Sequence, residues 1–585
     1  MSDMTSSDNL PLPPMALSRW GTEAEVRDLG KGIRGLLRDV LGVTAESGLH
    51  FDPAAVVASP SRLTHADLTA LADIVGEGNL STADAQRLPR ARGKSTPDLL
   101  SWRLRPEVDC PDAVVAPRDD DEVAALLAWC GREGVAMVPF GGGTSVVGGL
   151  TPDAGGHRAV ISVDLAHFDS LESIDPDSGE AVLGAGLSGP RAEELLAEHG
   201  FSLGHFPQSF PYATLGGYAM TRSSGQASAG YGRFDEMVRG LTVVTPVGVI
   251  EAGRAPASAA GPDLRQWLMG SEGAFGVCTR VRLRIHPVPQ TVRHEAFRFP
   301  DFATGAAALR AVEQQGAGPT VIRLSDEAET AVNLATATEA IGERAEGVSS
   351  EGAGAEGAGA VGVGAGGVGA EGAGGDGGSG GGGDSAGGDA GGCLCLTLFE
   401  GTPEHAGSRH AETRAVLLAH GGVSLGAGPA EAWEHGRFGA PVLRDALLDN
   451  GALVETLETA TDWSNLPALR DAVAGALTTS LEASGTPALV MCHISHVYPT
   501  GASLYFTVVA GQRGEDPVAQ WTQAKRAASE AIMATGGTIT HHHAVGVDHR
   551  PYLEAEIGEV GVRMLRAVKH AVDPKGVCNP GTLIP

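Results

Sequence analysis

The sequence predicts an α+β protein with several domains. The chain has 585 residues, strand-like apolar runs alternate with helix-like segments between residues 112 and 290, and its seven cysteines are irregularly spaced. At roughly 100–200 residues per domain, this length gives about three domains. Because no CxxC pair occurs, we expect neither a disulfide framework nor a zinc ribbon.

Residues 1–100 are expected to form an N-terminal tail and a helical segment. Residues 1–14 are polar and carry three prolines, a composition typical of a loose tail. From Glu23 to Val43 the apolar residues recur at helical spacing, which predicts an amphipathic helix that packs on the main body.

Residues 107–290 are expected to form a ligand-binding domain. Apolar runs predict strands, and the periodic segments between them predict helices. The expected strands span 113–117, 135–140, 159–165 and 180–186, and the expected helices span 119–134 and 190–200. Glycine clusters follow several strands, at points where the backbone can approach a ligand closely.

Residues 291–515 are expected to form a second α+β domain, interrupted by an insertion at 346–392. The insertion holds 23 glycines and seven acidic residues but no lysine or arginine. Such a segment buries too little apolar surface to offset its ordering entropy, so we expect a disordered loop. Residues 516–585 then form a C-terminal segment, with helices expected over 516–535 and 554–573.

The charge balance limits the partners. With 42 basic and 71 acidic side chains, the net charge is −29, which repels nucleic acid and anionic lipid surfaces. We expect no nucleic-acid partner. No basic start followed by an apolar run occurs, and no uninterrupted apolar run of about 18 residues occurs, so we expect a cytoplasmic protein. Peripheral membrane contact and a homodimer stay open.

A glycine triplet is the first candidate ligand site. Gly141, Gly142 and Gly143 follow a strand-like run and precede Thr144 and Ser145. Without Cβ atoms, successive backbone N–H groups can converge on an anion, and the two hydroxyls add donors. The triplet is neither a Walker loop nor a GxGxxG fingerprint, so a flexible turn without a ligand is the alternative for this motif alone.

Three later segments, 208–217, 221–225 and 270–277, occur in order after the triplet. Together the four resemble the FAD-binding domain of the vanillyl-alcohol oxidase and p-cresol methylhydroxylase (PCMH-type) superfamily. The resemblance implies a two-subdomain FAD-binding domain, an α+β cap domain for the substrate and a C-terminal helical segment. The cofactor-binding residues that it implies are Pro139, Phe140, Gly141, Gly142, Gly143, Thr144, Ser145, Gln208, Ser209, Thr214, Gly217, Thr221, Arg222, Ser223, Ser224, Glu272, Gly273, Gly276 and Val277.

The residue before the triplet bears on how the cofactor is held. Histidine-linked members of the superfamily place their histidine at this position, whereas this chain has Phe140. The resemblance therefore implies non-covalent FAD.

Motifs in the second half narrow the resemblance to alkyl-dihydroxyacetonephosphate synthase and its bacterial relatives. The similar segments are 203–205, 322–326, 442–445, 503–506 and 541–546, and the likeness runs from about residue 15 to the end. This family exchanges the acyl group of acyl-dihydroxyacetone phosphate for a fatty alcohol in ether-lipid synthesis, without net oxidation. The resemblance therefore implies an FAD-dependent alkyl transferase with a lipid substrate.

The same resemblance assigns roles to individual residues. Tyr505 moves a proton, Arg444 binds the substrate phosphate, and Arg323 is required for activity. On residue type alone, a tyrosine such as Tyr505 is more often a core residue than a catalyst, and the alternative for Arg444 is a surface helix charge paired with Asp445.

His541, His542 and His543 are the remaining catalytic candidates, because neutral imidazoles suit proton transfer. We expect a strand here, in which consecutive rings point to different sides and at most two address one ligand. No acidic cluster lies nearby in the sequence, so we predict no metal. The chain has Ala544 where the family commonly has glycine.

Two alternatives remain for the function. An FAD-linked dehydrogenase or oxidase of a 2-hydroxy acid, of the glycolate or D-lactate type, shares the flavin domain, although its relatives typically carry Glu-His-Gly in place of the histidine triplet. A non-catalytic flavin module whose acidic loop recruits a partner is the second alternative.

Overall fold

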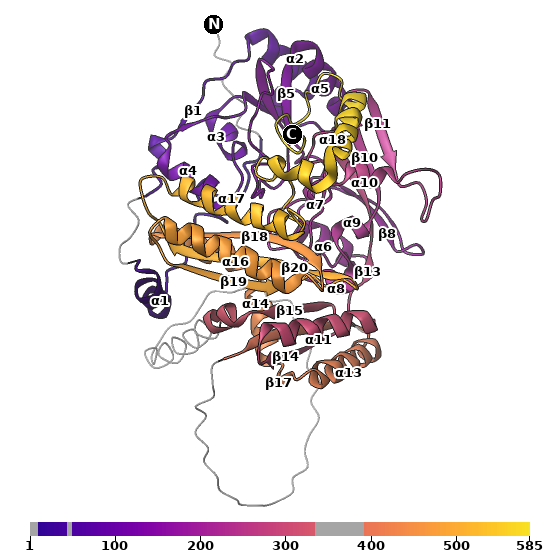
Figure 1. Cartoon of the computed structure of the whole chain (residues 1–585). Helices are drawn as coiled ribbons and strands as arrows, with labels where there is room; N and C mark the ends of the chain where they lie inside the picture. The colour runs from indigo at the N-terminus through magenta and orange to yellow at the C-terminus, as the bar shows by residue number, and fades with distance from the viewer. Residues whose placement is uncertain (1–9, 44–48, 317, 334–390) are drawn as a thin grey trace, which may run out of the picture.

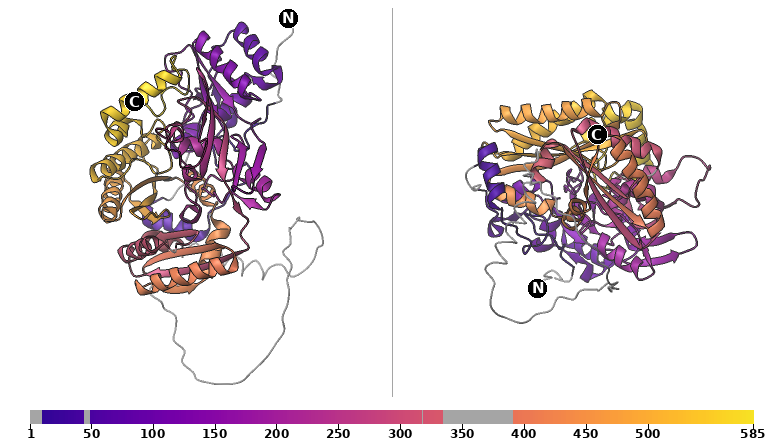
Figure 2. Two further views of the ribbon diagram at one scale, coloured as in Figure 1. Left: turned by 90° about the vertical axis from the view of Figure 1, so that its right-hand side faces the viewer. Right: turned by 90° about the horizontal axis from the view of Figure 1, so that it is seen from below.

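A computed structural model describes residues 10–43, 49–316, 318–333 and 391–585, and it confirms the α+β class. Figures 1 and 2 show two small sheets with their helices at one end of the molecule and a large sheet at the other. We call these parts the small-sheet half and the large-sheet half. Apart from its last two residues, the insertion at 346–392 lies outside the described residues, as does the tail before Leu10.

The small-sheet half contains a four-stranded and a five-stranded sheet. The four-stranded order is β2 (Leu80–Ser81), β4 (Ala113–Val115), β6 (Ala159–Asp164) and β5 (Val135–Phe140). The antiparallel five-stranded order is β11 (Gly248–Ala252), β10 (Val238–Thr245), β12 (Val277–Arg284), β8 (Glu180–Gly184) and β7 (Leu171–Asp175). Helix α5 (Asp120–Glu133) connects β4 to β5 and allows both to run parallel to β6.

Short elements complete this half. Two small ribbons pair β1 (Val57–Ala58) with β3 (Glu107–Val108) and β9 (Phe201–Ser202) with β13 (His286–Pro287). The helices of this half include α2 (His65–Val75), α3 (Asp84–Arg87), α6 (Gly189–Ala197), α7 (Leu215–Thr221), α8 (Ser228–Tyr231), α9 (Phe234–Met237) and α10 (Leu264–Leu268). Helix α4 (Thr96–Leu104) packs instead in the core of the large sheet.

The large-sheet half is an antiparallel sheet of seven strands. Their order is β17 (Val423–Gly426), β14 (Thr291–Phe299), β16 (Cys393–Gly401), β15 (Val321–Ser325), β19 (Ala488–Ile494), β20 (Gly501–Gly511) and β18 (Ala452–Asp462). One face packs in the largest core with α11 (Phe302–Gln315), α13 (Pro403–Ala419), α16 (Leu466–Ala483) and α17 (Pro517–Thr535). The other face meets α1 (Lys31–Leu41), α14 (Gly428–Gly436) and α15 (Ala440–Asp449).

Strand periodicity decides which side chains face the small-sheet half. In β20, Leu504, Phe506 and Val508 enter the large core, whereas Tyr505 and Val509 line a cavity on the opposite face. Successive side chains of a strand point to opposite faces, so this alternation follows directly from the sequence. Tyr505 and Phe506 therefore face opposite sides of the large sheet.

The N-terminal predictions need correction. The helix expected from Glu23 to Val43 begins only at Lys31, after Gly30. The segment after residue 9 is not a loose tail, since Leu10 is only 4% exposed and its carbonyl accepts a hydrogen bond from Gln86. The donor comes from 76 residues away, which local composition cannot reveal.

The C-terminal segment returns to the small-sheet half. Helices α17 and α18 (Leu553–Val572) occupy the predicted positions, and Cys578 then forms a parallel bridge with Met137 of β5. All seven cysteines are free and buried. Among the described residues, no helix combines the length and the apolar character needed to cross a membrane. The division into domains stays a prediction.

Candidate active site

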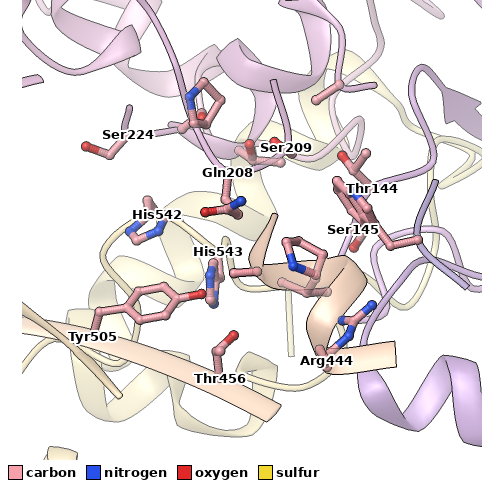
Figure 3. Close-up of a pocket in the computed structure, with 18 of the residues that line it drawn as sticks. Thr144, Ser145, Gln208, Ser209, Ser224, Arg444, Thr456, Tyr505, His542 and His543 are labelled. Atoms are coloured by element: carbon pink, nitrogen blue, oxygen red, sulfur yellow. The ribbon is translucent and has the colours of Figure 1, made fainter. Parts of the chain in front are cut away.

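A cavity of about 580 Å³ has walls from both halves of the molecule. The wall from the small-sheet half contains the glycine triplet and most of the predicted cofactor-binding residues. The opposite wall contains Arg323, Arg444, Tyr505, His542 and His543. Figure 3 shows Tyr505, Thr456 and His543 facing one another, with Thr144 and Ser145 further along the cavity.

The glycine loop has the properties of an anion cradle. The backbone N–H groups of Gly142, Gly143 and Thr144 donate no hydrogen bond to any described residue. Gly143 has a φ of 70°, which favours glycine, and a Cβ on Gly142 would overlap the carbonyl oxygen of Tyr212. The unpaired donors fit the diphosphate of a dinucleotide.

Gln208 adds an unpaired side-chain donor to these backbone donors. Its Nε2 is buried and forms no hydrogen bond within the described part of the chain. Figure 3 places Gln208 between Ser209 and His543. A buried donor without a partner costs free energy unless a ligand satisfies it, so this wall fits the ring system of FAD.

Two predicted cofactor residues do not reach the cavity. Arg222 instead donates to the carboxylate of Asp235 at 3.1 Å and to the carbonyl of Gln266 at 2.7 Å. Val277 is fully buried in the core of the four-stranded sheet. Both lie beside lining residues in the sequence, but their side chains hold the fold together.

Tyr505 lies at the centre of a stack of rings. The register places it directly opposite Glu458 on one neighbouring strand and His493 on the other. The ring centroids of Tyr505 lie 4.8 Å from His493 and 6.1 Å from His542, and both pairs are stacked. Burial raises the pKa of Tyr505 to about 12, so its hydroxyl is protonated at neutral pH.

Arg323 contacts His493, the ring that stacks on Tyr505. Its guanidinium donates to Glu329 at 2.6 Å and lies within 3.0 Å of the His493 ring nitrogens. Burial opposes ionisation of Glu329, but Arg323 and His493 together hold its pKa well below the ordinary value. His493 was not predicted, because its proximity to Arg323 depends on strand pairing. Glu329 was not predicted either, although it lies only six residues after Arg323.

The histidine triplet lies in a loop, so the predicted strand is wrong. A buried carboxylate on β18, Glu458, shapes this loop by accepting hydrogen bonds from the backbone N–H groups of all three histidines. His542 and His543 line the cavity, whereas His541 does not. The sequence near the triplet holds no acidic cluster and so gave no sign of this contact, because Glu458 precedes His541 by 83 residues.

The ring nitrogens of His541 have polar partners within the site. His541 Nε2 lies 2.5 Å from the Tyr498 hydroxyl, and its Nδ1 lies 3.0 Å from His542 Nδ1. Burial lowers the pKa of His542 and lowers that of His543 to about 3. Both rings are therefore neutral at physiological pH and able to accept a proton.

A metal-binding alternative also lies here. Ring nitrogens of His496, His541 and His542 lie within 4.8 Å of one another. Each ring already has a polar neighbour, with His496 Nδ1 lying 3.2 Å from the Ser224 hydroxyl. These contacts supply partners without an ion, and the absence of a resident metal stays a prediction.

The sequence left two interpretations of Arg444, a phosphate-binding residue and a surface charge paired with Asp445, and the structure has features of both. Arg444 pairs with Asp445 at 3.0 Å and donates to the carbonyl of Lys94 at 2.7 Å. It is no surface charge, because its side chain is only 11% exposed and lines the cavity. Nη2 lies 3.0 Å from the Asp445 carboxylate but forms no hydrogen bond with the described residues, so the Arg444 guanidinium is an ion-paired cation with an unused donor.

Comparisons with known proteins agree with this geometry. Residues 111–253 match the family described as FAD binding domain, and residues 288–583 match the C-terminal domain of FAD linked oxidases. Alkyldihydroxyacetonephosphate synthase of Trypanosoma brucei brucei is 31% identical over 547 residues, which cover 93% of this chain and 84% of that protein. The chain belongs to the alkyldihydroxyacetonephosphate synthase family. It is an FAD-dependent enzyme, as the sequence predicted.

Further relatives support the assignment. The synthase of Dictyostelium discoideum is 30% identical, with 85% of this chain and 77% of that protein covered. A solved structure of alkyldihydroxyacetonephosphate synthase covers 97% of this chain and 98% of its own, with 25% identity and a TM-score of 0.77. A p-cresol methylhydroxylase structure, 14% identical with a TM-score of 0.62 and covering 88% and 95%, shares the fold, which confirms the PCMH-type architecture.

Proposed function

We propose that this enzyme exchanges the acyl group of acyl-dihydroxyacetone phosphate for a long-chain alcohol. The observation that carries the proposal is a cavity in which Arg444, Tyr505 and two neutral histidines adjoin an extensive apolar lining. Such a lining suits hydrocarbon, and the guanidinium suits a phosphate. The apolar residues come from α1, α15 and the large sheet and include Ile33, Leu36, Leu37, Leu443, Leu447, Val454, Leu489, Met491 and Val509.

The residues present fit FAD. The N–H groups of Gly142, Gly143 and Thr144 would bind its diphosphate, and Gln208 would donate to its ring. Bound FAD supplies a reversible electron acceptor next to the substrate carbon. We propose that it is held non-covalently, because Phe140 stands before the triplet and packs in a small core. Release of all FAD into the supernatant of acid-precipitated protein would support this.

The side chains of the large-sheet half would handle phosphate and protons. Arg444 holds the phosphate through Nη2, and the protonated Tyr505 donates from its hydroxyl. His542 and His543 are neutral and accept protons at a ring nitrogen. Arg323 acts through His493, which it fixes against the Tyr505 ring.

Oxidation of a 2-hydroxy acid is the competing function. Mitochondrial D-lactate dehydrogenase of Arabidopsis thaliana is 25% identical over 82% of this chain and 74% of that protein. A small polar acid would leave the apolar lining from α1 and α15 without a role. That lining therefore favours the lipid substrate.

The exchange reaction can be tested with purified FAD-loaded protein. Acyl-dihydroxyacetone phosphate and a long-chain alcohol should give one alkyl ether and one free fatty acid for each turnover, detected by mass spectrometry. Release of fatty acid without any ether would refute the proposal. Bleaching of the flavin by glycolate or D-lactate under nitrogen would support the competing dehydrogenase.

Location and assembly are finer predictions. We propose a cytoplasmic enzyme, on the basis of its composition, and peripheral membrane contact and a homodimer stay open. Cell fractionation tests the location, and sedimentation of the purified protein with and without zwitterionic vesicles tests the other two points.

A further inference from the structure

Residues 541–546, which we call the histidine loop, are held by carboxylates from both halves of the molecule. Glu458 belongs to β18 of the large sheet, and its side chain is completely buried. Glu272 lies between α10 and β12 of the small-sheet half and is also buried. These two carboxylates supply acceptors to five of the six backbone N–H groups of the loop.

Glu458 holds the first half of the loop. Its Oε2 accepts the N–H of His541 at 2.6 Å, and its Oε1 accepts those of His542 at 3.0 Å and His543 at 2.9 Å. The Thr540 hydroxyl donates to Oε1 as well, at 2.7 Å. Three consecutive N–H groups can converge on one carboxylate only in a bent backbone, which explains why this segment is not a strand.

Glu272 holds the second half. Its carboxylate accepts the N–H of Val545 at 3.1 Å and that of Gly546 at 2.9 Å. Its own carbonyl accepts a hydrogen bond from Asn579 at 2.6 Å, and its φ of 52° is rare for a side chain of this size. The backbone strain at Glu272 therefore accompanies a specific contact with the loop.

Ala544 separates the two anchored segments. It has a φ of 76°, in the left-handed region that favours glycine, and its carbonyl accepts a hydrogen bond from His549 at 2.8 Å. Contacts on both sides must hold a non-glycine residue in this conformation. The two carboxylates provide those contacts.

We propose that Glu458 and Glu272 are positioning residues that fix the histidine loop between the two halves and so present His542 and His543 to the cavity. The kinetic consequence rests on the proposed function, whereas the position of the loop does not. Hydrogen bonds to a buried charged acceptor are stronger than those to a neutral acceptor, so replacing Glu458 by an amide should loosen its own segment. Burial raises the pKa of Glu272 to about 7, so Glu272→Gln should loosen its segment most clearly above this pH, where the native carboxylate is charged. The exchange experiment is therefore run at about pH 8.

Hydrogen exchange of the FAD-loaded protein, read by mass spectrometry on overlapping peptides, tests the proposal. Glu458→Gln should speed exchange at residues 541–543 about tenfold or more, and Glu272→Gln should do so at 545–546. Glu295→Gln is the matched control, because it removes a buried carboxylate of the same large sheet that binds His410, Arg414 and Ser424 instead. It should leave both segments protected.

Kinetics of the same variants supply the second readout. Glu458→Gln should lower kcat by about a hundredfold with KM and FAD content nearly unchanged, and Glu458→Asp, which keeps the charge, should recover part of kcat. Unchanged loop protection in folded Glu458→Gln and Glu272→Gln, or an equal loss in Glu295→Gln, would overturn the inference. If Glu458→Gln does not fold, Glu458→Asp and Glu272→Gln decide the outcome. If the variants show faster exchange in the loop but the wild-type protein makes no ether, the proposed function is refuted and the positioning role of the two carboxylates is not.

Discussion

The two walls of the cavity are built by different means. The wall from the small-sheet half presents unpaired backbone N–H groups, carried by a glycine loop with little room for side chains, beside polar side chains such as Gln208. The wall from the large-sheet half presents ionisable side chains. Strand alternation and cross-strand register place Tyr505 and His493, whereas helix α15 carries Arg444 and the histidine loop carries His542 and His543. A backbone site binds a constant group such as a diphosphate, whereas a side-chain site can be tuned for one reaction. Substitutions in the two walls should therefore have different consequences.

The largest effect should follow loss of the Tyr505 hydroxyl. Tyr505→Phe keeps the stacked ring but removes the proton donor, so kcat for ether formation should fall by about a thousandfold while FAD stays bound. Tyr231→Phe is the control, since that partly buried tyrosine pairs with Glu400 and does not line the cavity. Loss of FAD from Tyr505→Phe would contradict the assignment of FAD binding to the small-sheet wall and of catalysis to the large-sheet wall.

A methyl group on the glycine loop should have the opposite consequence. In Gly142→Ala the new Cβ would overlap the carbonyl of Tyr212, so the loop must shift and the affinity for FAD should fall at least tenfold. The measurement is titration of stripped protein with FAD by flavin fluorescence. Gly475→Ala in α16, where the added carbon meets no neighbouring atom, should leave FAD binding intact. Normal FAD affinity in Gly142→Ala would show that the loop is not the diphosphate site.

Arg444 should affect substrate binding more than turnover. Arg444→Lys keeps a positive charge but loses the planar donor geometry, so KM for the phosphate substrate should rise by about tenfold. Inhibition by inorganic phosphate should weaken in parallel. A lower kcat with an unchanged KM would instead place the phosphate elsewhere.

The buried histidines should make stability depend on pH. The folded-state pKa of His543 is about 3, below the ordinary 6.5, so the unfolded state binds more protons between these values. Its contribution is complete above pH 6.5 and is lost as the pH falls towards 3, at up to about 1.4 kcal/mol per pH unit. Thermal unfolding at pH 7 and pH 5 measures the loss, and His543→Gln should reduce it. An identical dependence in His543→Gln would show that other groups dominate.

Chelation should have the smallest effect. His496, His541 and His542 already have polar neighbours, so dialysis against EDTA should leave the rate of ether formation and the FAD content within about twofold. Loss of activity that Zn²⁺ restores would turn the histidine cluster into a metal site.

The sequence predicted more of the residues in the small-sheet wall than of those in the large-sheet wall. The glycine triplet and the alternation around Tyr505 are local patterns, so both could be read directly. His493 and Glu458 could not be found, because they reach the site through strand pairing between distant segments. The histidine triplet was predicted as a strand for the same reason, since the carboxylate that bends it lies 83 residues earlier. Glu329 lies only six residues after Arg323, in the helical segment that follows β15, and no motif pointed to it. Arg222 and Val277 do not line the cavity, because a motif match says nothing of the direction of each side chain.

The most direct test of the whole account uses a long-chain alcohol labelled with ¹⁸O at its hydroxyl, supplied with acyl-dihydroxyacetone phosphate to the FAD-loaded enzyme. If the alcohol takes the place of the acyl group on the substrate carbon, the ether product carries the label and the released fatty acid does not. Unlabelled ether, labelled fatty acid, or fatty acid without any ether would contradict the account.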